Sequence, residues 1–145
     1  MSGLALQQLL VSSDSFQFQA LRFILMHSRK NCQRRLWLLT GTGEGPSLAK
    51  AFIGKGWQVS VSVVSYEASL SYFGLGLESL WVGKLEGVEG ISAVLKNADK
   101  ASKGFDCIID ATHPFAGVIS ANLKIASSIH GLRLIRYERF CWKFV

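Results

Sequence analysis

The amino-acid sequence predicts an α/β fold built on a doubly wound parallel sheet of about five strands. Short runs of apolar and β-branched residues alternate with longer segments in which apolar residues recur at helical spacing. The connections between these segments are short and contain glycine. Strands that alternate with helices in this way form a parallel sheet with helices on both of its faces.

The first expected unit is a strand, a helix and a second strand within about 30 residues. Residues 36–41 (LWLLTG) form a short apolar run that ends in glycine, as a buried parallel strand does. Residues 46–56 follow as a helix, with Pro46 at the first helical position and glycines at the end. Residues 57–65 are rich in β-branched side chains and complete a unit with the size of a right-handed crossover.

The same alternation continues towards the C-terminus. The further strands are expected at residues 79–83, 105–110 and 132–137, and the further helices at residues 87–99 and 114–131. Gly131 is expected to end the last helix. The apolar residues expected to share one face of this helix are Val118, Ile119, Ile125, Ala126 and Ile129.

Residues 1–35 differ from the rest of the chain and are predicted to be a loose N-terminal extension, so that the folded domain covers residues 36–145. The formal net charge is +6. The extension accounts for +4 of it, because it contains five Arg or Lys residues and one acidic residue, Asp14. The expected sheet region is therefore nearly neutral, and a nucleic-acid partner is not indicated.

Composition excludes several other classes of protein. No apolar run approaches the roughly 18 residues of a membrane-spanning helix, and no basic region precedes the first apolar stretch as in a signal peptide. We therefore expect a cytoplasmic protein without a membrane partner. Cys32, Cys107 and Cys141 are odd in number and far apart, which is typical of reduced thiols. The histidines lack metal-ligand spacing, so no metal is expected.

Small residues follow the first expected strand in the stretch TGTGEGP, residues 40–46. Such residues let backbone N–H groups approach a phosphate, and the start of the next helix adds positive potential. Gly41 and Gly43 fit the first two glycines of the pattern G-x-G-x-x-G, but Pro46 stands at the third. A tight strand-to-helix turn without a ligand is the alternative.

The stretch IIDATHPFA, residues 108–116, follows the fourth expected strand. A residue before proline avoids the helical region, so His113 is expected at the helix cap and Pro114 in the first turn. Thr112 and His113 would then lie at the same sheet edge as the glycine turn. The alternatives are a capping role for Thr112 and an ordinary surface position for His113. Asp110 is expected to be a cap or a turn-former.

Taken in order, these segments resemble the precorrin-6A reductase family, including its cobalt-precorrin-6A form. The similar segments are LLTGTGEGPSLA, SVVS at the end of the second strand, VGKL at residues 82–85, IDATHPFA with ISAN in the following helix, and RYER before Trp142. The resemblance covers about residues 36–142, the N-terminal half of such proteins, and DATHPFA is its most specific part.

The resemblance implies a Rossmann-like domain that binds NADPH, at residues 36–145. It also implies an oxidoreductase of cobalamin biosynthesis that acts on a CH–CH group and reduces a double bond in a corrin precursor, converting precorrin-6A to precorrin-6B. In the family this tetrapyrrole lies between two such domains. The second domain does not follow in this chain.

The resemblance also assigns site residues by position. The glycine turn would hold the phosphates and ribose of NADPH, the residues after the second strand would lie near the adenosine, and the DATHPFA stretch would line the nicotinamide and the macrocycle. His113 is our choice of catalytic proton donor. Asn122 and Arg139 would contact the substrate, Arg139 through an acidic side chain of the macrocycle. The residues placed at the cofactor are Gly41, Thr42, Gly43, Glu44, Ser65, Tyr66, Thr112 and Phe115.

Some features depart from the family pattern. No proline follows the last expected strand. Glu67 lies near the place where a 2′-phosphate would be bound, and an acid there favours NAD. Family members are also longer than the matched region. Three interpretations therefore stay open: a separate polypeptide supplies the second domain, the chain is a non-catalytic dinucleotide-binding module, or it is a truncated remnant of the reductase.

Overall fold

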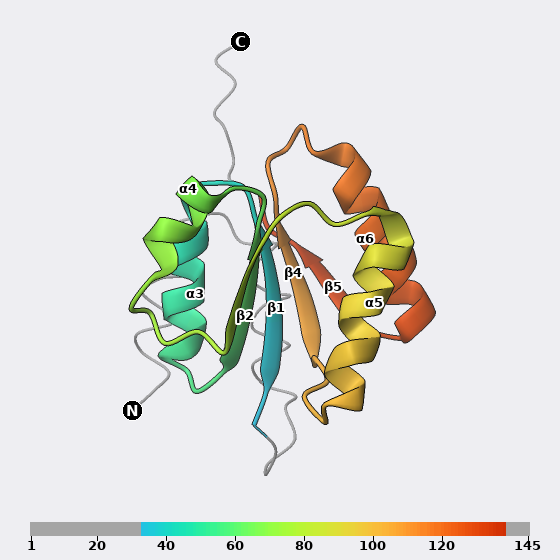
Figure 1. Ribbon diagram of the computed structural model, residues 1–145, viewed down its shortest axis with the longest axis horizontal. Helices are drawn as coiled ribbons and strands as arrows, with labels where there is room; N and C mark the ends of the chain where they lie inside the picture. Colours follow the sequence, from blue (N-terminus) through green and yellow to red (C-terminus); the bar gives the residue numbers. More distant parts are fainter. Residues whose placement is uncertain (1–32, 139–145) are drawn as a thin grey trace.

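The computed structural model describes residues 33–138, which form one parallel sheet with helices on both faces (Figure 1). The sheet has five strands in the order β3-β2-β1-β4-β5, and every neighbouring pair is parallel. This arrangement confirms the predicted doubly wound α/β fold. The strands are β1 (Arg35–Thr40), β2 (Gln58–Val63), β3 (Ser79–Val82), β4 (Cys107–Ala111) and β5 (Arg133–Arg136).

The helices divide between the two faces of the sheet (Figure 1). On one face lie α3 (Gly45–Ile53), the short α4 (Tyr66–Ser69) and the 3-10 helix η1 (Leu70–Tyr72). On the other face lie α5 (Gly87–Lys100) and α6 (Gly117–His130). A β-strand presents alternate side chains to opposite faces, so β1, β4 and β5 contribute to two hydrophobic clusters, one under each set of helices, whereas β2 and β3 contribute to the cluster on the α3 side.

The central strands β1 and β4 are apolar along nearly their whole length because helices cover them on both sides. Leu36 and Leu38 of β1 pack towards α3, and Trp37 packs towards α5 and α6. The Trp37 ring stacks on Phe105 with centroids 5.7 Å apart, and its Nε1 donates a hydrogen bond of 2.8 Å to Ser62 Oγ. The core therefore fixes β1, whose carboxyl end carries the glycine turn.

The chain leaves β1 in one direction along the sheet, through β2 to β3, and then crosses to β4 and β5 on the other side. The switch point lies between β1 and β4. In open parallel sheets, ligands bind outside the carboxyl ends of the strands at such a point. The glycine turn after β1 and the Thr112–Phe115 stretch after β4 both begin there.

The start of α6 differs from the prediction. Pro114 lies before the helix, which begins at Gly117 with Ala116 as the capping residue, three positions later than predicted for the start. The amide of Ala116 donates to the carbonyl of His113 at 2.8 Å, and the amide of Phe115 donates to His113 Nδ1 at 3.2 Å. These bonds close a separate turn ahead of the helix, so the prediction of His113 at the cap was wrong.

The face of α6 that packs on the sheet also differs from the predicted set. Of the predicted face, Ala126 is buried and Ile119 packs against the core, whereas Val118, Ile125 and Ile129 are exposed. Leu123 and Ser127 complete the buried side. The helix is apolar around much of its circumference, so the spacing of apolar residues alone did not identify the buried side. Gly131, in the left-handed conformation with φ 64°, ends α6 as predicted.

The described residues include one of the three cysteines and exclude both ends of the chain. Residues 1–32 and 139–145, with Cys32 and Cys141, lie outside the described residues, whereas Arg35 belongs to β1. Cys107 is buried, and burial raises the pKa of its thiol to about 12. Between residues 33 and 138, no helix is long and apolar enough to cross a membrane, and no group of three potential ligands could hold a metal ion.

Candidate functional site

The glycine turn joins the carboxyl end of β1 to α3. Gly45, the first residue of α3, is buried, and a Cβ atom there would collide with the Tyr72 hydroxyl and the Thr40 side chain. Only glycine lets α3 approach the sheet this closely. Gly45 therefore has the packing role of a third glycine, a role that the pattern G-x-G-x-x-G assigns to position 46.

The surroundings of the other turn residues are open. A Cβ atom on Gly43 would meet nothing within 4 Å, so the space beside the Cα atom of this residue is open. Thr42 Oγ1 is buried without a hydrogen-bond partner in the described part of the chain. Burial raises the pKa of the Tyr72 hydroxyl below the turn, and the neighbouring Thr40 side chain partly offsets the rise.

A second turn, formed by Thr112 to Phe115 after β4, lies against the glycine turn. The amide of Gly41 donates to the carbonyl of Ala111 at 3.4 Å, and a Cβ atom on Gly41 would lie 3.4 Å from the backbone nitrogen of His113. The rings of His113 and Phe115 lie 5.2 Å apart at an angle of 33°. Phe115 is 92% exposed, which is unusual for a phenylalanine in a folded domain.

A buried ion pair lies directly below this second turn. The Asp110 side chain is almost fully buried, and its Oδ1 accepts hydrogen bonds from Arg136 Nη1 at 2.8 Å and from the Thr112 hydroxyl at 2.6 Å. Its Oδ2 accepts from the Ser120 hydroxyl at 2.6 Å. The prediction that Asp110 forms a turn is confirmed by the bond from the Thr112 amide at 3.1 Å. Arg136 and Ser120 were not identified from the sequence.

A cavity of about 630 Å³ opens at the switch point, above the carboxyl ends of β1, β2 and β4. Its size falls within the range of about 300–1,000 Å³ that is usual for small-molecule and cofactor sites. Its walls come from the loops after β1, β3 and β4 and from the first turns of α6. The predicted site residues that it brings together are Gly41, Thr112, His113, Phe115 and Asn122.

The loop after β3 supplies a wall of the cavity that the sequence analysis did not assign. Gly83, Lys84 and Leu85 belong to this loop, and Val118 of α6 lies across from the strand ends as a further apolar lining residue. The segment VGKL, noted for its resemblance, contains this loop. The sequence signal was present, but no role followed from its composition.

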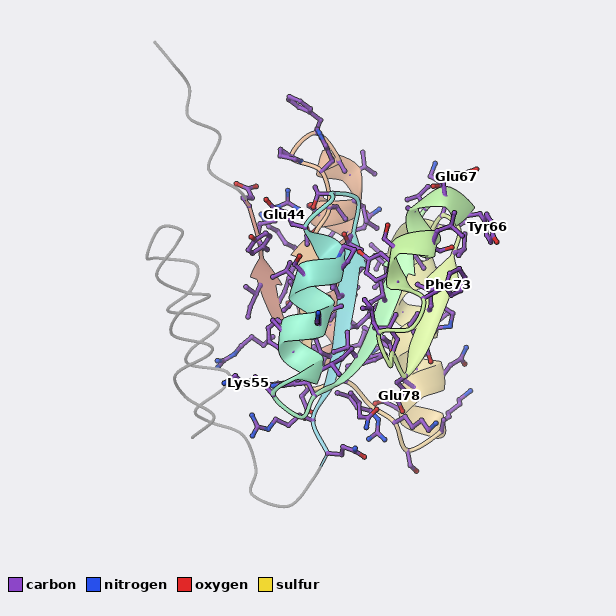
Figure 2. The ribbon with its side chains drawn as sticks, turned by 90° about the vertical axis from the view of Figure 1, so that its left-hand side faces the viewer. Glu44, Lys55, Tyr66, Glu67, Phe73 and Glu78 are labelled. Atoms are coloured by element: carbon purple, nitrogen blue, oxygen red, sulfur yellow. The ribbon has the colours of Figure 1, made fainter. Side chains whose placement is uncertain are left out.

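Other predicted residues lie near this end of the molecule without lining the cavity. These residues are Thr42, Gly43, Glu44, Ser65 and Tyr66. Figure 2 shows Glu44 at the start of α3 and Tyr66 and Glu67 on α4, at the end of the molecule opposite to Lys55 and Glu78. Ser65 caps α4 by accepting a hydrogen bond of 3.2 Å from the Ala68 amide. Arg139 lies outside the described residues.

The doubly wound sheet, the glycine turn and the cavity at the switch point define a Rossmann-like α/β domain. A sequence model of the Precorrin-6x reductase CbiJ/CobK family matches residues 35–144, and the chain belongs to this family. The resemblance that the sequence motifs indicated is thereby confirmed.

Individual relatives agree with the family assignment. A precorrin-6A reductase of Rhodobacter capsulatus is 32% identical over 74% of this chain and 40% of its own length. One of Rhodococcus erythropolis is 30% identical over 74% of this chain and 41% of its own. A solved structure of CobK precorrin-6A reductase has a TM-score of 0.60 and 31% identity over 78% of this chain and 41% of that one. The chain thus spans about two fifths of the relatives that it matches.

Proposed function

We propose that this chain is the NADPH-binding part of a precorrin-6A reductase, an oxidoreductase that reduces a double bond of a tetrapyrrole precursor of cobalamin. The observation that carries the proposal is the cavity at the switch point, which is lined by Gly41 and by the turn from Thr112 to Phe115. Both segments belong to the region that matches the family.

The glycine turn fits a dinucleotide. The pyrophosphate would lie at the N-terminus of α3, where backbone N–H groups and the helix dipole favour negative charge. The space beside Gly43 is open to such a ligand, and the buried Thr42 hydroxyl has no hydrogen-bond partner among the described residues. Glu44 would reach the ribose from the start of α3, and Ser65 and Tyr66 would lie on the adenosine side.

We assign NADPH rather than NADH as the cofactor. An acid at the end of the second strand selects NAD by binding the ribose 2′-hydroxyl. Val64 and Ser65 directly follow β2 here, and the nearest acid, Glu67, is exposed on α4. The residues directly at the end of β2 therefore do not include the acid that selects NAD.

The bound cofactor would supply the hydride, and the residues of this chain would orient the reactants and deliver a proton. His113 Nδ1 accepts a hydrogen bond from the Phe115 amide, so a neutral His113 ring carries its proton on Nε2. We assign His113 as the proton donor in its doubly protonated form, because a neutral ring that lost its only N–H proton would become an imidazolate anion. Phe115 and Val118 offer apolar contacts to a flat macrocycle, and Asn122 and Lys84 offer polar and cationic contacts to its carboxylates.

The complete reaction would also use the part of the relatives that this chain does not match. We propose that a separate polypeptide supplies that part and that the tetrapyrrole binds between the two. Arg139 would then contact an acidic side chain of the macrocycle. We further propose a cytoplasmic location for the assembly.

Reconstitution tests this proposal. The chain is mixed with a polypeptide corresponding to the uncovered part of the Rhodobacter capsulatus relative, and NADPH oxidation is followed with precorrin-6A. We expect oxidation in the mixture and none with either polypeptide alone, because donor and acceptor must be held together. The intact relative serves as the positive control. An inactive mixture in which the chain still binds NADPH would favour the non-catalytic module instead.

A further inference from the structure

The buried ion pair below the Thr112–Phe115 turn joins three elements at one point. Asp110 and Arg136 are register partners on the neighbouring strands β4 and β5, so their side chains emerge side by side on the same face of the sheet. Ser120, on the second turn of α6, completes the group from above. We call these residues, Asp110, Ser120 and Arg136, the clamp.

The clamp holds the Thr112 side chain in one position through hydrogen bonds. The Thr112 hydroxyl donates to Asp110 Oδ1 and accepts from Arg136 Nη1 at 2.9 Å. Its backbone amide donates to the same carboxylate oxygen. Thr112 is therefore held through both its side chain and its backbone, and its hydroxyl is not available to donate to a ligand.

Thr112 in turn fixes the residues that line the cavity. His113 and Phe115 follow it in a turn closed by the bond from the Phe115 amide to His113 Nδ1. These two rings are exposed to solvent, so few contacts other than the turn itself hold them in place. The geometry of this cavity wall consequently depends on the anchoring of Thr112.

The clamp also balances charge below the cavity. The Asp110 side chain is 2% exposed and is paired with the side chain of Arg136, which is 24% exposed. The other partners of the carboxylate are hydroxyl and amide groups without net charge. Without Arg136, an unpaired negative charge would remain below the Thr112–Phe115 turn that lines the cavity.

We propose that Arg136 is a positioning residue, which acts through Asp110 and Thr112 to hold the His113–Phe115 turn in the geometry that binds the cofactor. This inference rests on the proposed function, because the cofactor is the ligand whose affinity it would control. The anchoring of the turn itself does not depend on the identity of the ligand.

The test compares three variants with the wild-type chain: Arg136→Met, Arg136→Lys and the double variant Asp110→Asn/Arg136→Met. Arg133→Met is the matched control, since Arg133 begins the same strand but pairs in register with Cys107, at the other end of β4 from Asp110. Two quantities are measured for each folded variant. These are the hydrogen-exchange rates of the amides of residues 112–116 and the NADPH dissociation constant from calorimetric titration.

We expect Arg136→Met to accelerate amide hydrogen exchange in residues 112–116 and to weaken NADPH binding by about tenfold. This is a typical effect for residues that hold ligand-binding residues in place without contacting the ligand. Arg136→Lys should restore part of the affinity because it keeps a cation beside Asp110. The double variant should bind more tightly than Arg136→Met because it removes the unpaired charge. If Arg136→Met does not fold, the other two variants carry the comparison.

This design distinguishes failure of the positioning role from failure of the proposed function. Wild-type exchange rates and wild-type affinity in folded Arg136→Met, equal to those of Arg133→Met, would overturn the positioning role. A wild-type chain that binds no NADPH would contradict the proposed function. In that case the exchange rates alone decide whether Arg136 anchors the turn.

Discussion

Replacing Asp110 with alanine is expected to lower the free energy of unfolding by about 3 kcal/mol, as breaking a buried ion pair does. The substitution removes the acceptor of bonds from Thr112, Ser120 and Arg136. Arg136 remains partly exposed and keeps its bond of 2.9 Å to Glu138, so the loss should lie near the lower end of the usual range. Urea denaturation followed by circular dichroism measures the change.

Asp106→Ala is the control for this prediction. Asp106 is an exposed acid just before β4, and it accepts a hydrogen bond of 2.8 Å from the Arg35 amide. Its removal should cost less than about 1 kcal/mol, as for a typical solvent-exposed hydrogen bond. Equal losses in the free energy of unfolding for the two variants would contradict the larger contribution expected from the buried Asp110.

Replacing Gly45 with alanine is expected to destabilise the protein by about 1–3 kcal/mol, the usual range for overpacking a well-filled site. The added methyl group would lie 2.9 Å from Thr40 Cβ and would also collide with the Tyr72 hydroxyl. Either α3 moves away from the sheet or Tyr72 leaves its buried position. Thermal and urea denaturation of the variant would measure the effect.

Gly43→Ala provides the matched control two residues earlier in the same turn. Its added methyl group meets nothing within 4 Å, so the stability should stay within about 0.5 kcal/mol of wild type. NADPH binding, in contrast, should weaken, because the methyl group would occupy space where the backbone faces the expected phosphates. A stable Gly45→Ala variant together with an unstable Gly43→Ala variant would contradict the packing described for this turn.

The fold could be predicted from the sequence because the strong signals are local. Apolar runs and helical spacing identified the five strands and helices α3, α5 and α6. The unexpected parts depend on contacts between segments far apart in the chain. Gly45 could not be recognised as a packing glycine until Tyr72, on η1, was known to lie against it.

The candidate site could be predicted only in part for the same reason. Thr112, His113 and Phe115 lie within four consecutive residues, so one stretch of sequence placed them together near Gly41. Ser120 and Arg136 join Asp110 through the register of β4 with β5 and the packing of α6, which spacing along the chain does not reveal. The loop after β3 reaches the cavity through the same kind of long-range arrangement.

The start of α6 shows where a local rule was incomplete. A proline often occupies the first turn of a helix, and this preference predicted a helix from residue 114. The side chain of His113 instead accepts a hydrogen bond from the amide of Phe115. This bond stabilises a separate turn, and the helix begins only at Gly117. The exposed position of Phe115 follows from this turn.

Calorimetric titration of the chain with NADPH tests most directly the claim that the cavity at the switch point binds the cofactor. The wild-type chain is compared with Phe115→Ala and with Phe73→Ala, which removes another exposed aromatic ring, one that does not line the cavity. We expect saturable binding to the wild type and to Phe73→Ala, and binding about tenfold weaker to Phe115→Ala, as for an aromatic contact residue. A folded, monodisperse wild-type chain that does not bind NADPH, or equal affinities for all three proteins, would contradict the claim.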